Sequence, residues 1–237
     1  MAQTSSSRAA ADSPKSAANF VRRSAEAIRS RDGSITGWKA ERRALLEYAE
    51  KYGKLLSQDH LSQFSYKGSG AEHRVFHDAE KGRAVKVTHP NRYGHSAYGP
   101  GLSATPSEYL RRLAWANGIL GDDFRIHGVI CEEEHIEIVS SHPWITAHPE
   151  SPQPSTEEIA AYFKRFDFEP VSVDPSVPLY FNRRSGLLII DATDLNVIRD
   201  RNEYIAAIDV GIGFPGPQIL RQIEEYFEPS LPLTESG

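Results

Sequence analysis

Residues 187–196 have the sequence LLIIDATDLN, in which an apolar run ends at Asp191 and is followed by Asn196. Further along, residues 204–211 have the sequence YIAAIDVG, and a second apolar run ends at Asp209. Short apolar runs of this kind predict β-strands, so both aspartates are expected where a strand ends. Carboxylate and amide oxygens are the ligands that Mg²⁺ prefers. The two segments therefore predict a site for a divalent cation.

The spacing of these polar residues suggests a chemical role for each. Protein kinases carry a catalytic-loop aspartate, an asparagine five residues later and, at the end of a further strand, an Asp-x-Gly metal ligand. We therefore predict that Asn196 and Asp209 are metal ligands. Asp191 is predicted to be catalytic, because it would receive or orient the proton of an acceptor hydroxyl. Asp194 is a second candidate for this base, although loop aspartates commonly cap turns.

A glycine-containing segment upstream predicts a phosphate-binding loop. Residues 68–75 have the sequence GSGAEHRV, and Lys86 follows in a β-type run. Glycine lets backbone N–H groups approach phosphate oxygens closely, and a lysine on the next strand can reach the same phosphates. We predict that Gly68, Gly70 and Val75 bind the nucleotide and that Lys86 is both nucleotide-binding and catalytic. Taken alone, the segment also fits an ordinary glycine hairpin beside a solvated lysine.

A carboxylate should hold Lys86, and the sequence offers two. Residues 105–108 have the sequence TPSE, which predicts a helix that begins with a capping box and a proline in its first turn. Glu108 in this helix is the predicted partner of Lys86, and it is included among the cofactor-binding residues. The capping box gives Glu108 a structural role as well, so Glu72 in the glycine loop stays open as the alternative partner.

Hydrophobic periodicity divides the chain into four parts. We expect a disordered tail over residues 1–18, a helical extension over 19–63, a β-rich N-terminal lobe over 64–141 and a reduced C-terminal lobe over 142–237. Helices are expected over 20–28, 38–56, 105–116, 155–166 and 218–227, and strands over 74–77, 83–88, 124–131, 135–140, 187–190 and 204–208.

Composition excludes several classes of protein. The net charge of −5 gives no electrostatic footprint for nucleic acid or for an anionic membrane surface. The single cysteine cannot form an intramolecular disulfide, and no apolar run has the roughly 18 residues that cross a bilayer. We therefore expect a cytoplasmic protein without a nucleic-acid or membrane partner.

In these motifs and their order, the chain resembles the serine/threonine/tyrosine kinase-like domain found in polyvalent proteins of phages and conjugative elements. The resemblance covers residues 41–216. It implies an α+β, reduced protein-kinase-like two-lobed fold, with a β-rich N-lobe that contains one helix, a small C-lobe and a preceding helical extension. It also implies ATP and Mg²⁺ as cofactors and a protein Ser, Thr or Tyr hydroxyl as acceptor. The matching segments are 45–49 (LLEYA), 68–75, 85–90 (VKVTHP), 105–110 (TPSEYL), 117–123 (NGILGDD), 142–145 (HPWI), 191–196 and 209–210.

Some positions depart from the protein-kinase pattern. Ile189 and Ile190 replace the usual His-Arg pair, Thr193 replaces a lysine, and His73 replaces the third glycine of the loop. The short stretch after Gly211 leads us to expect no activation segment or substrate-docking helices. The acceptor is therefore an unknown protein or a small molecule. A nucleotide-binding pseudokinase or interaction module, a small-molecule kinase and a nucleotidyl transferase remain as alternatives.

Overall fold

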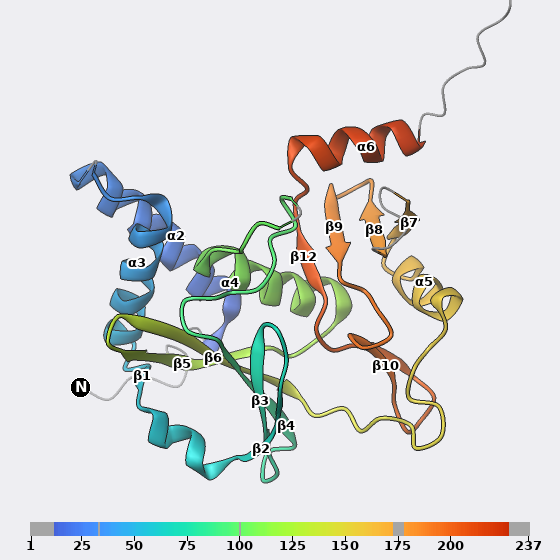
Figure 1. Cartoon of the computed structure of the whole chain (residues 1–237), viewed down its shortest axis with the longest axis horizontal. Coiled ribbons are helices and arrows are strands. Elements are labelled where there is room, and N and C mark those ends of the chain that lie inside the picture. The colour runs from blue at the N-terminus through green and yellow to red at the C-terminus, as the bar shows by residue number, and fades with distance from the viewer. Residues whose placement is uncertain (1–11, 33, 100, 173–177, 228–237) are drawn as a thin grey trace, which may run out of the picture. The chain divides into compact units, whose positions relative to one another are not determined.

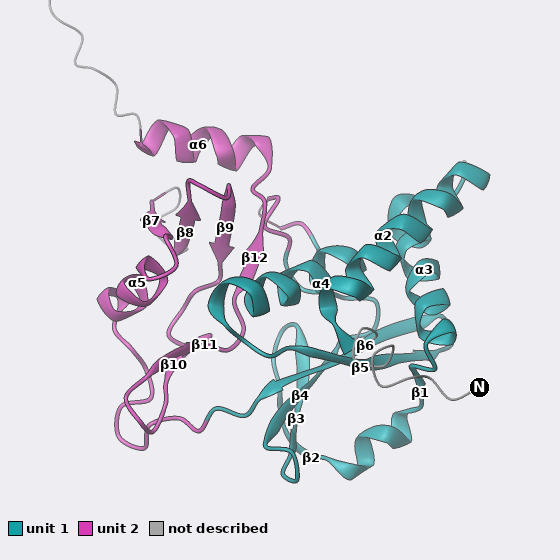
Figure 2. Ribbon diagram, turned by 180° about the vertical axis from the view of Figure 1, so that it is seen from behind, with its two compact units in different colours: residues 1–95, 103–145 teal, residues 96–102, 146–237 magenta. Residues whose placement is uncertain are grey.

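The protein is a mixed α+β chain that divides into two compact units. A computed structural model describes residues 12–32, 34–99, 101–172 and 178–227 (Figure 1). Unit 1 consists of residues 1–95 and 103–145, and unit 2 consists of residues 96–102 and 146–237 (Figure 2). The short segment 96–102 thus belongs to unit 2, although the chain on both sides of it belongs to unit 1.

Unit 1 is built on a six-stranded sheet with the order β1-β5-β6-β4-β3-β2. β1 pairs with β5 in parallel, and the other neighbours are antiparallel. The strands are β1 (Leu55–Leu56), β2 (Ser65–Ser69), β3 (His73–Asp78), β4 (Arg83–Thr88), β5 (Arg125–Glu132) and β6 (His135–Pro143). The strands predicted from β-type runs are confirmed, and β4 has the predicted bounds.

Three α-helices accompany this sheet, and α2 packs against both α3 and α4. They are α2 (Pro14–Arg31), α3 (Gly37–Lys51) and α4 (Pro106–Trp115), with a 3₁₀ segment η1 (Gln58–Gln63) after β1. α2 buries small and branched residues at helical spacing, among them Ala17, Val21, Ala25 and Ile28. This stripe lets α2 lie close to its neighbours.

The predicted disordered tail needs a correction at its end. The helix α2 already begins at Pro14, so the prediction of disorder is wrong for residues 14–18, and residues 1–11 lie outside the described part of the chain. Proline suits the first helical turn, and Ala17 and Ala18 are buried, which stabilises this first part of the helix. Among the described residues, none of the helices combines the length and the apolar character that crossing a lipid bilayer requires.

The start of α4 follows the predicted capping box. Thr105 Oγ1 accepts a hydrogen bond from the Glu108 N–H at 3.4 Å, and Glu108 Oε2 accepts one from the Thr105 N–H at 2.8 Å. Beyond the predicted end, the chain continues as a π-helical turn, η2 (Ala116–Leu120), which ends at Gly121 in the left-handed conformation at φ 74°. Glycine is favoured there because it has no Cβ to clash.

Unit 2 contains a four-stranded antiparallel sheet with the order β12-β9-β8-β7 and a separate β10-β11 hairpin. Its core lies between the sheet and α6, where Phe181 and Leu188 pack with Ile223. The elements are α5 (Thr156–Lys164), β7 (Glu169–Val171), β8 (Leu179–Asn182), β9 (Leu187–Ile190), β10 (Val197–Arg199), β11 (Ile205–Ala207), β12 (Gly211–Gly213) and α6 (Pro217–Phe227). The strands β9 and β11 and the helices α5 and α6 were predicted.

Candidate functional site

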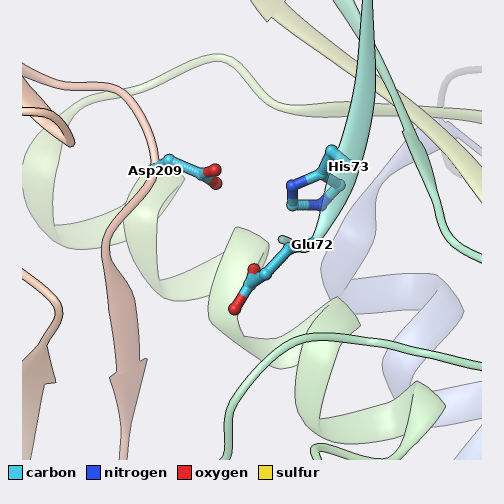
Figure 3. Close-up of side chains that lie close together, drawn as sticks. All are labelled: Glu72, His73 and Asp209. Carbon is cyan, nitrogen blue, oxygen red and sulfur yellow. The ribbon is translucent and has the colours of Figure 1, made fainter. Parts of the chain in front are cut away.

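In unit 2, the pairing of β12 with β9 brings two of the predicted aspartates to the same place. Gly211 lies opposite Ile190 in this antiparallel pair. Asp191 directly follows Ile190, and Asp209 precedes Gly211 by two residues on the segment that leads into β12 (Figure 3). Because the strands run in opposite directions, both aspartates lie at the same end of the pair.

The β10-β11 hairpin brings Asn196 to this end as well. Val197 lies opposite Ala207 at the open end of this hairpin, farthest from its turn. The main-chain carbonyl of Asn196 then accepts hydrogen bonds from the N–H groups of Ile208, at 2.8 Å, and Asp209, at 3.3 Å. The structure therefore brings Asp191, Asn196 and Asp209 together within unit 2, while their chemical roles stay predictions.

The side chain of Asn196 is oriented by a hydrogen bond across the loop. Its Nδ2 donates to the main-chain carbonyl of Asp191 at 2.9 Å. Because the amide nitrogen makes this bond, Oδ1 is the end of the amide that can act as a metal ligand. Together with the Asp209 carboxylate it supplies only hard oxygen donors. This donor set fits Mg²⁺.

The loop from Asp191 to Asn196 is held in a tight conformation. The Thr193 carbonyl accepts hydrogen bonds from the N–H groups of Asn196, at 3.0 Å, and Val197, at 2.9 Å. Asp191 itself adopts φ 58°, which is uncommon for a residue other than glycine, and its side chain is exposed. Strained backbone of this kind clusters at functional sites, and the exposed carboxylate is accessible to a substrate.

The glycine of the Asp-x-Gly motif has a packing reason of its own. A Cβ at Gly211 would lie 2.4 Å from Ile190 Cγ1 and 2.9 Å from Ile190 Cδ1. Only glycine permits this close approach of β12 to β9 without moving Ile190. Gly211 therefore helps to keep the segments that carry Asp191 and Asp209 close to each other.

In unit 1, Lys86 lies in the middle of the sheet and is only 5% exposed. It is opposite Val75 on β3 and Ser140 on β6. Directly opposite residues on neighbouring strands point to the same face, so Val75, Lys86 and Ser140 share one face. The prediction that Val75 and Lys86 contact the same ligand fits this register.

The helix α4 lies over that same face. The Tyr109 hydroxyl on α4 is 3.0 Å from His73 Nε2 and 3.1 Å from Ser140 Oγ. His73 is two residues before Val75 on β3, and Ser140 is the register partner of Lys86, so both belong to the face that carries Lys86. A carboxylate from this side of the sheet is thus a reasonable partner for the buried ammonium group.

Both predicted partners of Lys86 also have other contacts. Glu108 accepts the capping hydrogen bond from Thr105. Glu72 lies directly before β3 (Figure 3), forms a 2.7 Å ion pair with Arg112 and accepts a hydrogen bond from the His95 N–H at 3.0 Å. Which of the two carboxylates pairs with Lys86 stays a prediction.

A third carboxylate near Lys86 was missed by the sequence interpretation. Burial raises the pKa of Asp122, and a hydrogen bond from Asp123 and then the nearby Lys86 ammonium partly offset this rise. Asp122 follows the π-helical turn η2, and its N–H donates to the Ala116 carbonyl at 3.3 Å. The segment 117–123 was noted only for its resemblance, because no local pattern in it predicts a contact with β4.

The glycine loop joins β2 and β3 and is internally hydrogen-bonded. The register shifts between Tyr66 and Gly68, and Gly68 adopts φ 156° at this bulge. The Gly70 N–H donates to the His73 carbonyl at 2.9 Å, and His89 Nε2 lies 2.9 Å from the Gly70 carbonyl. The Gly70 N–H would have to break its hydrogen bond with the His73 carbonyl in order to bind a phosphate. The predicted role of Gly70 in nucleotide binding therefore requires a change in this loop.

The chain matches a family model described as "Serine/Threonine/Tyrosine Kinase found in polyvalent proteins" over residues 39–213. The match includes Lys86, Asp191, Asn196 and Asp209, and it confirms the resemblance stated from the motifs. No curated protein and no solved structure matches the chain significantly.

Proposed function

The chain belongs to the family of serine/threonine/tyrosine kinases found in polyvalent proteins, and on this premise we propose that it is an ATP- and Mg²⁺-dependent phosphotransferase. The acceptor that we propose is a protein Ser, Thr or Tyr hydroxyl. The observation that carries the proposal is the arrangement of Asp191, Asn196 and Asp209 in unit 2, in which the Asn196 amide is fixed by the Asp191 carbonyl.

Each residue of this group has a role in the proposed reaction. Asn196 Oδ1 and the Asp209 carboxylate would hold Mg²⁺, which when bound neutralises charge on the phosphate oxygens. The exposed Asp191 carboxylate orients the acceptor hydroxyl and accepts its proton. The acceptor oxygen then forms a bond to the γ-phosphorus of ATP as the bond to ADP breaks. Most of the catalysis here is positioning, so the fixed loop matters as much as the carboxylate.

The residues of unit 1 bind the nucleotide in this proposal. Lys86 holds the phosphates, and its burial at the centre of the sheet gives its ammonium group a defined position. Gly68, Gly70 and Val75 supply the loop and strand that lie along the nucleotide. Units 1 and 2 would serve as the two lobes of the kinase-like fold, and Glu108, Glu72 or Asp122 would pair with Lys86.

A comparison of the wild type with Asp191→Asn tests this proposal. Asparagine tolerates the positive φ of position 191 and removes only the charge, so a loss of activity reports on the carboxylate. We expect purified wild-type protein with ATP and Mg²⁺ to add a phosphoryl group to a hydroxyl, detected by mass spectrometry, and we expect Asp191→Asn to lose at least about two orders of magnitude in rate.

Other products would identify the alternatives. ATP binding without phosphoryl transfer or phosphate release, identical in the wild type and in Asp191→Asn, would contradict the enzyme and indicate a pseudokinase. A nucleotide attached to the modified protein would indicate a nucleotidyl transferase.

A further inference from the structure

A cavity of about 460 Å³ lies directly beside the loop that begins at Asp191. Its volume is within the range of about 300–1,000 Å³ that is common for ligand sites. The residues 192–194, which follow Asp191, form one wall, and the first turn of α5 forms another. A group bound here would therefore lie next to the residue proposed to act on the acceptor hydroxyl.

The charged side chains that line the cavity are both acidic. They are Glu157, in the first turn of α5, and Asp194, in the Asp191 loop, and the described lining contains no lysine, arginine or histidine. Neither carboxylate has an ion-pair partner among the described residues, whereas the adjacent Glu158 is paired with Arg199 at 2.8 Å. Hydrogen bonds from its own N–H and from Ser155 hold the pKa of Glu157 below its usual range. The cavity thus carries uncompensated negative charge.

A buried tyrosine gives the cavity a third polar group. Tyr180 on β8 lines the cavity and is only 2% exposed. Its neighbours Leu179 and Phe181 belong to the core under α6, so Tyr180 points to the other face of the sheet, where its ring contacts Phe163 of α5 at 4.9 Å. Its hydroxyl has no hydrogen-bond partner within the described part of the chain. The Tyr180 hydroxyl is therefore available for a hydrogen bond with a ligand in the cavity.

The remaining walls of the cavity are apolar and favour a ligand with an alkyl chain. Pro154, Ile159 and Ala192 contribute apolar atoms, and the Tyr180 ring adds an aromatic surface. Apolar walls with two carboxylates, a hydroxyl and an aromatic ring are complementary to a long side chain that has an alkyl stem and a cationic end. Arginine and lysine have this chemistry.

We propose that this cavity binds the arginine or lysine side chain of a protein substrate, close to the hydroxyl that receives the phosphate. The proposal rests on the proposed function, because it assigns a substrate class to the site formed by Asp191. It makes the enzyme selective for hydroxyls in basic segments. The carboxylates supply charge complementarity, and Tyr180 supplies a hydrogen-bond acceptor and a ring for the cation.

The test measures peptide binding without ATP, so its outcome does not depend on phosphoryl transfer. The probes are fluorescent serine peptides in which one arginine moves stepwise along a neutral sequence, each matched by a peptide with citrulline, which has nearly the same shape but no charge. For at least one arginine position, we expect the wild type to bind the arginine peptide about tenfold more tightly than the matched citrulline peptide. In the double variant Glu157→Gln/Asp194→Asn, this preference should fall to about twofold or less.

Three further measurements complete the test. Glu225→Gln removes an exposed carboxylate of α6 outside the cavity and should keep the full preference. Tyr180→Phe keeps the ring and should lower the affinity for the arginine peptide about two- to fivefold. Agmatine, a free guanidinium compound, should compete only weakly, because the proposed ligand is a protein segment.

The proposal is overturned if arginine and citrulline peptides bind equally at every position, or if the double variant keeps the preference. It is also overturned if agmatine binds as tightly as the best peptide, since the cavity would then bind a free cation as well as it binds a side chain of a protein segment. If the preference for arginine is confirmed but no phosphoryl transfer is detected, the cavity still binds a basic side chain and the proposed function is rejected. The failure of the cavity proposal can therefore be distinguished from the failure of the proposed function.

Discussion

The Nδ2 atom of Asn196 donates a hydrogen bond of 2.9 Å to the main-chain carbonyl of Asp191. This bond spans the loop and links the proposed metal ligand to the residue proposed to act on the acceptor. Its geometry requires an amide, because a carboxylate has no hydrogen to donate. The orientation of Oδ1 and the position of Asp191 are therefore coupled.

Asn196→Asp should disrupt this coupling. The new carboxylate would face the Asp191 carbonyl oxygen without a donor. Because the hydrogen bond that orients the proposed ligand is lost, we expect the rate of phosphoryl transfer to fall about 10–100-fold. Steady-state kinetics across a range of Mg²⁺ concentrations measure this effect. Gln222→Glu makes the same amide-to-acid change on the exposed side of α6 and should leave the rate unchanged. Equal rates for the wild type and Asn196→Asp would contradict the assignment of Asn196.

Gly211→Ala should impair activity through packing. The added Cβ would overlap Ile190, so β12 and β9 would move apart next to Asp209 and Asp191. Overpacking of this kind costs about 1–3 kcal/mol, and we expect a similar loss in the free energy of unfolding together with at least a tenfold loss in rate, about 1.4 kcal/mol. Urea denaturation and kinetics measure the two effects. Gly118→Ala is the control, because its Cβ would meet no atom within 4 Å and its φ is not positive.

The ion pair between Arg112 and Glu72 should contribute strongly to the stability of unit 1. Its side chains are only 7% and 13% exposed, so replacing Arg112 removes a largely buried ion-pair partner of Glu72. We expect Arg112→Met to lower the free energy of unfolding by about 3–5 kcal/mol, and the double variant Arg112→Met/Glu72→Gln to lose less than this. Chemical denaturation of both variants measures the difference.

A surface pair provides the contrast. Arg22 and Glu26 of α2 are 46% and 50% exposed, and Arg22→Ala should cost about 0.5 kcal/mol or less. An equal cost for Arg112→Met and Arg22→Ala would show that burial does not strengthen the Arg112–Glu72 contact.

The stability of unit 1 should also depend on pH through His127. Burial, together with the nearby Lys54 and Arg83, lowers the pKa of His127 to about 4, and its Nε2 lies 2.7 Å from Ser141 Oγ. The unfolded chain takes up a proton near pH 6.5, whereas the folded protein does so only near pH 4. Above pH 6.5, the neutral His127 contributes its full share to the free energy of unfolding. This contribution is lost as the pH falls toward 4, and the loss amounts to up to about 3 kcal/mol.

His127→Gln should make this part of the pH profile flatter. The free energies of unfolding of the wild type and the variant are measured at pH 8 and at pH 4.5. The difference at pH 8 reports on packing and on the contact with Ser141, because the imidazole is neutral in both the folded and the unfolded state. If the variant loses as much stability as the wild type between these two pH values, His127 does not titrate as described.

Sequence patterns correctly predicted the helices and strands that depend on short-range interactions, such as helix caps and continuous apolar runs. The capping boxes at Thr105 and Ser155 mark real helix starts, and the apolar runs 83–88 and 187–190 are β4 and β9. The helix expected over 38–56 ends at Lys51, and its last two positions form β1 instead. The strands β1, β2, β7, β8, β10 and β12 were not predicted. They have only two to five residues, and pairing with neighbours in the sheet or hairpin stabilises them more than their own sequence does.

The sequence predicted that Asp191, Asn196 and Asp209 lie close together, as they do in unit 2, while their chemical roles stay predictions. The spacing of Asp191, Asn196 and Asp209 pointed to a common site, and the β12-β9 register explains how two of them come together. The nearness of Asp122 to Lys86 depends on the π-helical turn that follows α4, which has no simple sequence pattern. The hydrogen bond that occupies the Gly70 N–H depends on how the loop closes on His73.

One labelling experiment tests the central claim, that Asp209 is part of a Mg²⁺ site for phosphoryl transfer. Wild-type protein, Asp209→Asn and the control Asp167→Asn are each incubated with ATP labelled on its γ-phosphate, Mg²⁺ and a cell lysate. Asp167 is exposed and has φ 63°, a conformation that asparagine adopts readily, so its variant should fold and act like the wild type. We predict labelled protein with the wild type and Asp167→Asn and at least a hundredfold less with Asp209→Asn, about 2.7 kcal/mol in the barrier. Equal labelling by all three proteins, or none by the wild type, would contradict the claim.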